Sequence, residues 1–347
     1  MRLITDNDGI DILRGSLCQT KSPFIAVDTE FVRQHTFYPE LSLVQIAFEN
    51  ECYVIDTLTP HWNAKQLRDI LFQDYLTLVF HSCRQDLEIF FHLYKALPQC
   101  LFDTQIAAIF MGLGETMSYD RLVKHYLNLT IDKSQQHTDW LRRPLCFKQI
   151  QYAARDVIYL ADIYPRMIAD LKKTGRFDWA LAEMKSLSNP SLLSVMTSTR
   201  LSRMGVSRNH YGLASALLAF RDRHASILNM NRARFLSDKT LSTMTAFRDI
   251  HKLRDFALRT THLEQWGLIE SLLETFENHK NSEDTSSPMS LKQQKELAEL
   301  RRKRDERAAV LNLPPHFLAS TSDLRTSILS GTGRLLTTWR KEALEVF

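Results

Sequence analysis

The stretch Phe-Ile-Ala-Val-Asp-Thr-Glu-Phe at residues 24–31 decides how the rest of the chain is interpreted. Its four apolar residues follow Ser22-Pro23 and predict a buried strand over residues 24–27. Because side chains on a strand alternate between faces, Asp28 and Glu30 project from one face, about 7 Å apart. Ionised carboxylates this close repel each other when partly buried and need a compensating cation. Oxygen ligands of this kind suit Mg²⁺ or Mn²⁺, so we expect a metal site at the end of this strand.

Short apolar runs alternate with helical patterns up to about residue 110. The runs that predict strands are 24–27, 43–48, 52–55, 78–80 and 101–102, and the helical patterns are 64–71, 85–94 and 104–111. No helical pattern separates the first two strands, and residues 49–51 are few enough for an antiparallel hairpin between the second and third. We therefore expect an α/β domain with a mixed sheet and a long packed helix over residues 147–171.

The chain beyond Asn189-Pro190 carries helical patterns and no strand pattern. The expected helices are 211–228, 238–245, 249–258 and 263–277. The polar segment 279–288 predicts a linker, and a last helical block starts at residue 291. The fold class that follows is an α/β domain with an all-α region after it.

Composition and charge limit the kinds of protein that this chain can be. Its 347 residues, 44% hydrophobic and 24% charged, suffice for two or three cores. No apolar run approaches the roughly 20 residues that span a bilayer, so no membrane association and a cytoplasmic location are expected. The five cysteines lack a C-x-x-C pair, which argues against a disulfide framework or a zinc site. Residues 186–347 hold 24 Lys and Arg against 17 Asp and Glu, an excess that fits either a nucleic acid partner or ordinary surface charge.

Further acidic residues lie at positions that could complete a metal site. Two divalent ions about 3.5 to 4 Å apart cleave a phosphodiester well, and three or four carboxylates from separate elements hold them. Asp86 starts a helix directly after the strand 78–80, at the sheet edge where ligands bind. Tyr152 and Asp156 are four residues apart on the long helix and therefore share a face, about 6 Å apart. A phenol beside a metal-bound water can orient the nucleophile and help to take its proton.

Each of these residues also has a structural interpretation. Asp86 is a residue type that the helix dipole favours in a first turn, and Asp103 fits an N-cap for the helix from residue 104. His81 fits a structural or solvent-facing role better than a metal ligand. The cluster Arg142-Arg143-Pro144 contacts phosphate or caps a turn.

Together the motifs resemble ribonuclease D of the DEDD exonuclease superfamily, in the subclass whose third motif contains tyrosine. The match extends over about residues 20–170. Its three motifs are Val-Asp28-Thr-Glu30-Phe-Val-Arg, then Phe-His81-Ser-Cys-Arg-Gln-Asp86 with Phe-Asp103-Thr, then Tyr152-Ala-Ala-Arg-Asp156 preceded by Asp132-Lys-Ser and Thr138-Asp-Trp.

The resemblance implies a ribonuclease H-like exonuclease fold, two divalent cations (Mg²⁺ or Mn²⁺) and removal of nucleotides from a 3′ end as 5′-monophosphates. Asp28, Glu30 and Asp156 would hold the ion that bears the water, and Asp28 would bridge to a second ion supported by Asp86. Tyr152 would position the attacking water. Gln45 and Lys133 also match family positions near the site, without an assigned role.

The helical half resembles HRDC domains (helicase and RNase D C-terminal). We therefore expect an exonuclease domain at 1–188, an HRDC domain at 205–281 and a second, shorter HRDC-like domain at 290–347. The expected enzyme is a monomeric 3′-to-5′ exoribonuclease that trims precursor tRNA and other structured RNAs, with no protein partner. A DNA substrate, an endonuclease of related fold and a nucleic-acid-binding scaffold without activity remain as alternatives.

Overall fold

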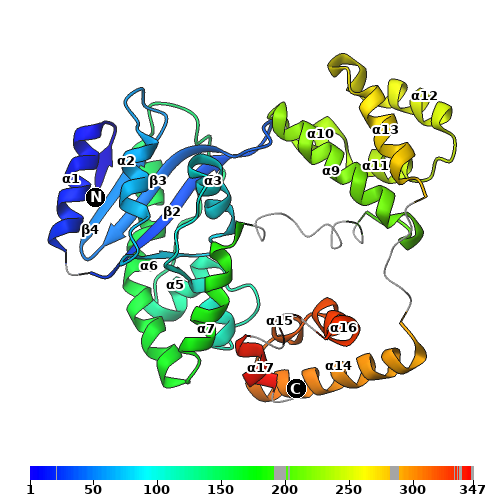
Figure 1. Ribbon diagram of the computed structural model, residues 1–347. Coiled ribbons are helices and arrows are strands. Elements are labelled where there is room, and N and C mark those ends of the chain that lie inside the picture. Colours follow the sequence, from blue (N-terminus) through cyan, green and yellow to red (C-terminus); the bar gives the residue numbers. More distant parts are fainter. Residues whose placement is uncertain are drawn as a thin grey trace. The chain divides into compact units, whose positions relative to one another are not determined.

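The chain forms two compact units in the computed structural model, which describes residues 1–20, 22–190, 201, 204–281, 289–331, 333, 335 and 338–344 (Figure 1). Unit 1 comprises Met1–Phe31, Leu41–Leu193 and Met289–Phe347. Unit 2 comprises Val32–Glu40 and Ser194–Pro288. No helix in the described part of the chain has the length and apolar character needed to cross a membrane.

Unit 1 is built on a mixed six-stranded sheet, as predicted. Its strands are β1 (Arg2–Ile4), β2 (Phe24–Val32), β3 (Glu40–Phe48), β4 (Glu51–Asp56), β5 (Thr77–Phe80) and β6 (Leu101–Asp103). They lie in the order β1-β4-β3-β2-β5-β6. The expected hairpin of β3 and β4 is antiparallel, while β1 pairs with β4, β2 with β5, and β5 with β6 in parallel.

The prediction that the first strand of the motif ends at residue 27 is wrong, because β2 continues to Val32. Thr29, Phe31 and Val32 are β-branched or aromatic residues that favour an extended backbone, and they carry the strand past the acids. Asp28 and Glu30 therefore lie within the strand and not at its end.

Helices cover both faces of this sheet. The first core joins β2 to α1 (Asn7–Gln19), α2 (Ala64–Leu71) and α3 (Arg84–Tyr94) through buried side chains such as Ile25, Leu13, Leu67 and Phe90. On the opposite face lies α6 (Phe147–Lys173), whose Tyr164 ring packs 4.5 Å from Phe24. Odd-numbered residues of β2 thus enter the first core, while even-numbered ones face α6.

Short helices complete the α/β part of unit 1. They are α4 (Thr104–Phe110), α5 (Tyr119–Leu127), α7 (Phe177–Met184) and η1 (Lys185–Ser188). The C-terminal helices α14 (Leu291–Leu311), α15 (Pro315–Leu318), α16 (Thr321–Ser330) and α17 (Trp339–Leu344) pack within the same unit. Arg340, 2% exposed, donates to both carboxylate oxygens of Glu183 in α7 at 2.5 and 2.9 Å. The extent of the expected second HRDC-like domain stays a prediction.

The described elements of unit 2 between residues 204 and 281 are helices. They are η3 (Arg208–His210), α9 (Tyr211–Ile227), α10 (Arg232–Phe235), α11 (Asp238–Met244), α12 (Ile250–Thr260), η4 (Leu263–Trp266) and α13 (Ile269–His279). The prediction of one helix over 263–277 is wrong. Gly267 has φ 65°, a left-handed conformation that ends η4 before α13 begins. Residues 282–288 of the predicted linker lie outside the described residues.

The segment 32–40 runs from the last residue of β2 to the first residue of β3 and belongs to unit 2. Phe37 is 8% exposed in the core of that unit, with the Arg232 guanidinium 3.9 Å from its ring centre. The Asn231 amide donates to the His35 carbonyl at 2.8 Å. The connection between β2 and β3 is therefore part of the helical unit.

Candidate active site

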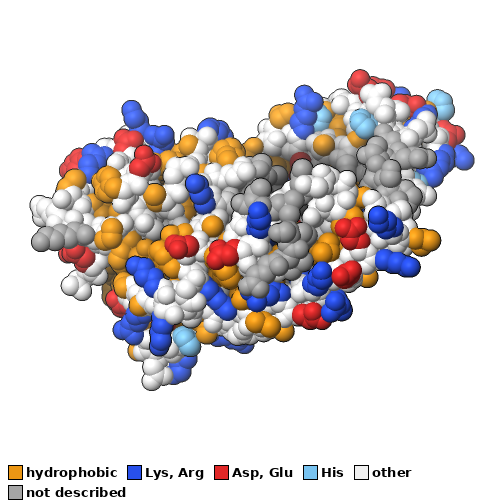
Figure 2. All heavy atoms as spheres, turned by 60° about the horizontal axis from the view of Figure 1, so that its bottom comes forward, with side chains coloured by type: hydrophobic (Ala, Val, Ile, Leu, Met, Phe, Trp, Pro, Cys, Tyr) orange, Lys and Arg blue, Asp and Glu red, His pale blue; other side chains and the backbone are white. Residues whose placement is uncertain are grey.

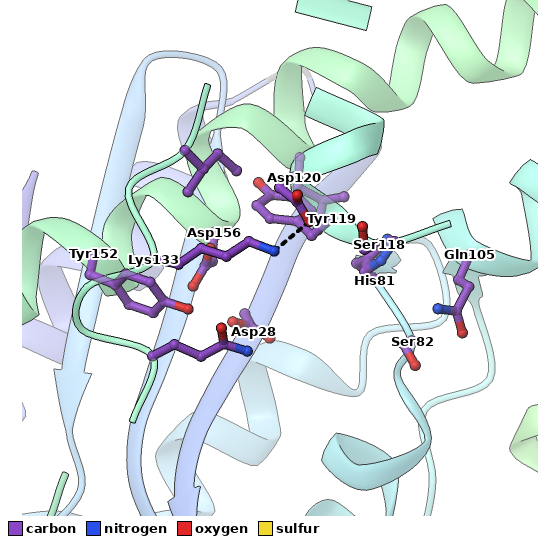
Figure 3. Close-up of a pocket in the computed structure, with 13 residues that line it drawn as sticks. Asp28, His81, Ser82, Gln105, Ser118, Tyr119, Asp120, Lys133, Tyr152 and Asp156 are labelled. Atoms are coloured by element: carbon purple, nitrogen blue, oxygen red, sulfur yellow. Dashed lines mark ion pairs between the residues drawn. The ribbon is translucent and has the colours of Figure 1, made fainter. Parts of the chain in front are cut away.

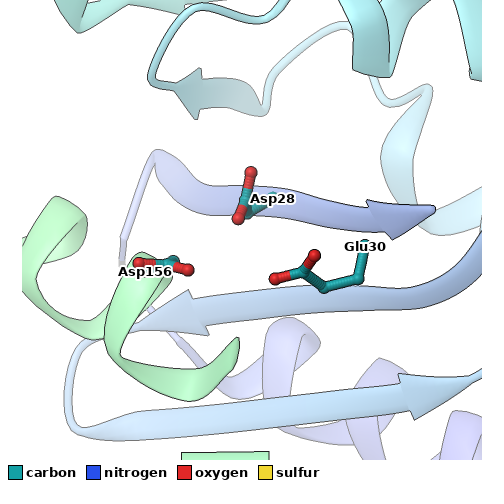
Figure 4. Close-up of side chains that lie close together, drawn as sticks. All are labelled: Asp28, Glu30 and Asp156. Carbon is teal, nitrogen blue, oxygen red and sulfur yellow. The ribbon is translucent and has the colours of Figure 1, made fainter. Parts of the chain in front are cut away.

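Three carboxylates from two elements converge on one space in unit 1. Oxygens of Asp28, Glu30 and Asp156 lie within 4.8 Å of one another. Asp28 and Glu30 come from the face of β2 that is turned to α6, and Asp156 comes from α6 itself (Figure 4). Strand alternation places Asp28 and Glu30 on one face of β2, and the packing of α6 on that face brings Asp156 to them.

The surroundings of these acids oppose their ionisation. Burial raises the pKa of Asp28 well above its usual range, and the nearby charge of Asp156 raises it further. Burial, followed by the charges of Asp28, Asp156 and Asp86, raises the pKa of Glu30 to about 10. Burial raises the pKa of Asp156 to about 7. A metal-free site therefore retains protons at neutral pH.

A divalent cation fits this donor set. Within the described residues, none of the three carboxylates has a Lys or Arg partner within salt-bridge distance. Hard oxygen donors in a partly buried cluster are the ligands that Mg²⁺ and Mn²⁺ prefer. The cation would supply the positive charge that the surrounding protein does not.

Asp86 lies beside this cluster and not within it. It is in the first turn of α3, 6% exposed, and accepts a hydrogen bond from Thr29 Oγ at 2.5 Å. Burial and then the charge of Asp28 raise the pKa of Asp86 well above its usual range. The charge of Asp28 therefore affects the pKa of Asp86, while the carboxylate oxygens of Asp86 lie outside the group of three.

Tyr152 and Asp156 line the same pocket, as their spacing on α6 predicts. The pocket has a volume of about 320 Å³ (Figure 3). Burial, and then the charges of Asp156, Glu30 and Asp28, raises the pKa of the Tyr152 phenol above its usual value. The phenol therefore keeps its proton at neutral pH and can serve as a hydrogen-bond donor.

The pocket is also lined by residues that the sequence analysis did not name or left without a role. Lys133 directs its ammonium to Asp120 at 2.6 Å (Figure 3). Tyr119 donates its hydroxyl to the Arg155 carbonyl at 3.0 Å, which links α5 to α6. The signal for Tyr119 was weak, because a tyrosine after a helix-capping serine has no distinctive pattern. His81 lies in the wall with its Nδ1 2.9 Å from Thr104 Oγ.

Two alternatives from the sequence are now decided. Asp103 caps α4 by accepting from the Gln105 amide, as predicted. Arg143 forms a two-bond ion pair with Asp56, both N–O distances being 2.7 Å. Its guanidinium also donates to Ser42, so the structural interpretation of the arginine cluster holds for this residue.

Gln45 has a different environment. It is fully buried on β3, and neither amide atom has a hydrogen-bond partner among the described residues. Its pairing with Val54 puts it on the sheet face turned to α6, the face that also bears Asp28 and Glu30. Gln45 is thus a polar group held on the site's face of the sheet.

The chain is similar to known exonucleases along most of its length. A family model described as 3′-5′ exonuclease matches residues 1–172. Ribonuclease D of Zymomonas mobilis is 36% identical over 288 residues, which are 80% of this chain and 72% of that protein. Ribonuclease D of Gluconacetobacter diazotrophicus is 40% identical over 229 residues, 65% of this chain and 58% of that protein. The chain spans 58% to 62% of the length of three curated ribonuclease D relatives, that of Gluconacetobacter diazotrophicus among them.

Solved structures support the fold. The crystal structure of Escherichia coli RNase D, titled as an exoribonuclease involved in structured RNA processing, matches with a TM-score of 0.80. The match covers 99% of this chain and 96% of that one at 24% identity. A protein from Bifidobacterium adolescentis matches with a TM-score of 0.67 at 21% identity, covering 95% of this chain and 89% of that one. At these identities the likeness concerns the fold alone.

Proposed function

Because the chain belongs to the ribonuclease D family, we propose that it is a metal-dependent exonuclease that removes nucleotides from the 3′ end of RNA. Its products are nucleoside 5′-monophosphates. The observation that carries the proposal is the convergence of Asp28, Glu30 and Asp156 within 4.8 Å, beside Tyr152, which lines one pocket with Asp28 and Asp156.

In this proposal the acids would hold two divalent cations. Asp28, Glu30 and Asp156 would hold the first, and Asp28 with Asp86, which lies beside Thr29, would hold the second. When bound, the cations neutralise the phosphodiester and favour both the attacking water and the leaving oxygen. The raised pKa values of Asp28, Glu30 and Asp156 support such a role, because deprotonation of the cluster requires added positive charge.

Tyr152 orients the attacking water in this proposal. Its phenol is protonated at neutral pH and lies in the same pocket as Asp156. A phenol O–H can donate to a non-bridging phosphate oxygen or hold the water in line with the phosphorus. Lys133 and Gln45 stay without an assigned role.

The substrates that we propose are the 3′ ends of precursor tRNA and other structured RNAs. The excess of Lys and Arg after residue 185 supports contact with an RNA backbone. We assign that contact to the HRDC-type regions 205–281 and 290–347, next to an exonuclease domain at 1–188. The enzyme works as a monomer in the cytoplasm in this proposal.

Digestion of end-labelled RNA tests the function. Purified protein with Mn²⁺ should release labelled 5′-monophosphates from a 3′-labelled strand, and chelation with EDTA should stop the reaction. Asp28→Asn should lose activity, while Asp162→Asn, an exposed acid on α6, should retain it. Internal fragments would indicate an endonuclease, equal digestion of matched DNA would remove the RNA assignment, and full activity of Asp28→Asn would refute the site.

A further inference from the structure

A second pocket lies next to the candidate active site in unit 1. It has a volume of about 420 Å³. One wall is the loop that precedes α5, and the other wall is a face of α5. The lining residues are Leu113, Gly114, Glu115, Thr116, Met117, Arg121, Lys124 and His125.

Three basic side chains converge on this pocket. Arg121, Lys124 and His125 occupy positions i, i+3 and i+4 of α5, which share one helix face, and all three are exposed. No ion pair involving any of them occurs among the residues that the structure describes. The one acid in the lining, Glu115, lies 3.6 Å from His316.

Arg121 and Lys124 differ in this respect from some other cations of unit 1. Figure 2 shows Lys and Arg side chains lying among acidic and hydrophobic ones on the face it presents. Several other exposed cations of unit 1 are paired, as in Arg302–Glu306 at 2.6 Å and Arg14–Asp11 at 3.2 Å. Arg121 and Lys124 outnumber Glu115, the one acid in the lining, so the pocket favours an anionic ligand.

The two pockets share a wall. Met117 lines the second pocket, and the next residue, Ser118, lines the active-site pocket. Asp120 lines the active-site pocket, and the next residue, Arg121, lines the second pocket. Lys124 lies about 6 Å along α5 from Asp120, given a rise of 1.5 Å per residue. A strand that advances about 3.4 Å along its axis per nucleotide, as in a duplex, covers this distance in about two nucleotides.

We propose that Arg121, Lys124 and His125 form a subsite for the RNA backbone on the 5′ side of the nucleotide being removed. The proposal rests on the proposed function. Gly114 in the lining has a φ of 108°, a conformation that favours glycine, and no atom lies within 4 Å of the position that a Cβ would take there. Recognition is by charge, so the subsite accepts any base sequence.

Salt-dependent binding tests the subsite without catalysis. A fluorescein-labelled single-stranded 12-mer RNA is titrated in EDTA, with fluorescence anisotropy as the readout. Arg121→Gln/Lys124→Gln should bind on the order of 20-fold more weakly at 0.1 M salt, and the slope of log Kd against log salt should fall by about 1.4, the value for two phosphates. The control pair Arg2→Gln/Lys65→Gln makes the same charge change at two exposed positions. Arg2 is on β1, at the sheet edge opposite β6, and Lys65 is on α2.

Strand length gives a second test. The advantage in kcat/KM of the 12-mer over a dinucleotide should shrink in Arg121→Gln/Lys124→Gln and persist in the control pair. An unchanged salt slope overturns the subsite, and so does an equal loss of RNA affinity in the control pair. A loss of affinity for an acidic peptide with an unchanged affinity for RNA also overturns it. Absence of nucleotide release by the wild-type protein overturns the proposed function instead, and the anisotropy result still decides the subsite.

Discussion

The Asp156→Asn substitution should stabilise the metal-free protein, with a pH dependence set by the acidic cluster. Asp156 has a pKa of about 7 in the folded protein against an ordinary value of 3.8. A raised carboxyl pKa means that its stability contribution is fully present below pH 4 and is lost as the pH rises to about 7. The loss amounts to about 4 kcal/mol, because each pKa unit corresponds to about 1.4 kcal/mol.

Asparagine carries no charge and escapes this penalty. In EDTA at pH 8, we expect Asp156→Asn to unfold on the order of 10 °C above the wild-type protein. The difference should vanish near pH 4. Mn²⁺ at about 1,000 times its Kd should cancel the difference, since an ion that binds only the folded wild type then adds about 4.1 kcal/mol.

Thermal unfolding followed by circular dichroism, from pH 4 to 8, with and without Mn²⁺, measures these effects. The control is Asp162→Asn, which removes an exposed acid from the same helix. A metal-free wild type at pH 8 that matches or exceeds Asp156→Asn in stability would refute the reasoning. An equal gain in Asp162→Asn would attribute the effect to the net charge of the helix.

Tyr152→Phe removes only the phenol oxygen, so kcat should fall at least ~10²-fold while the Mn²⁺ affinity measured by calorimetry is retained. Phe37→Ala empties a core position of unit 2 and removes the ring beneath Arg232, at a cost of about 3–5 kcal/mol, which hydrogen exchange of α9 in the full chain should report. Arg340→Ala removes both hydrogen bonds of Arg340 to the Glu183 carboxylate, so α17 should exchange its amides much faster, in line with a loss of about 3–5 kcal/mol.

Each of these outcomes has a matched control. For Tyr152→Phe, a loss of Mn²⁺ affinity as large as that of Asp156→Ala contradicts the role in orienting water. His35→Ala keeps the backbone carbonyl that accepts from Asn231 and should leave α9 protected, in contrast to Phe37→Ala. Lys341→Ala removes an exposed cation next to Arg340 and should leave α17 protected. Equal effects in variant and control would contradict the assigned contacts.

Local periodicity predicted much of the fold and of the candidate site. Alternation along β2 placed Asp28 and Glu30 on one face, and a four-residue spacing placed Tyr152 and Asp156 on one face of α6. The hairpin of β3 and β4 followed from a short connection. Local rules failed where a short signal competed with a longer pattern, as at Gly267, whose left-handed backbone divides an apparently continuous helix.

The sequence by itself determined the family, the mixed sheet and the identity of the acids, because these depend on motif order and on neighbours within a few residues. Only the tertiary structure decided that Asp156 comes within 4.8 Å of Asp28 and Glu30 while Asp86 stays outside the group. It also decided that Phe37 packs in unit 2 and that Arg340 joins α17 to α7 within unit 1. Such contacts join segments far apart in the chain, and desolvation and charge at the site depend on all the elements that pack around it.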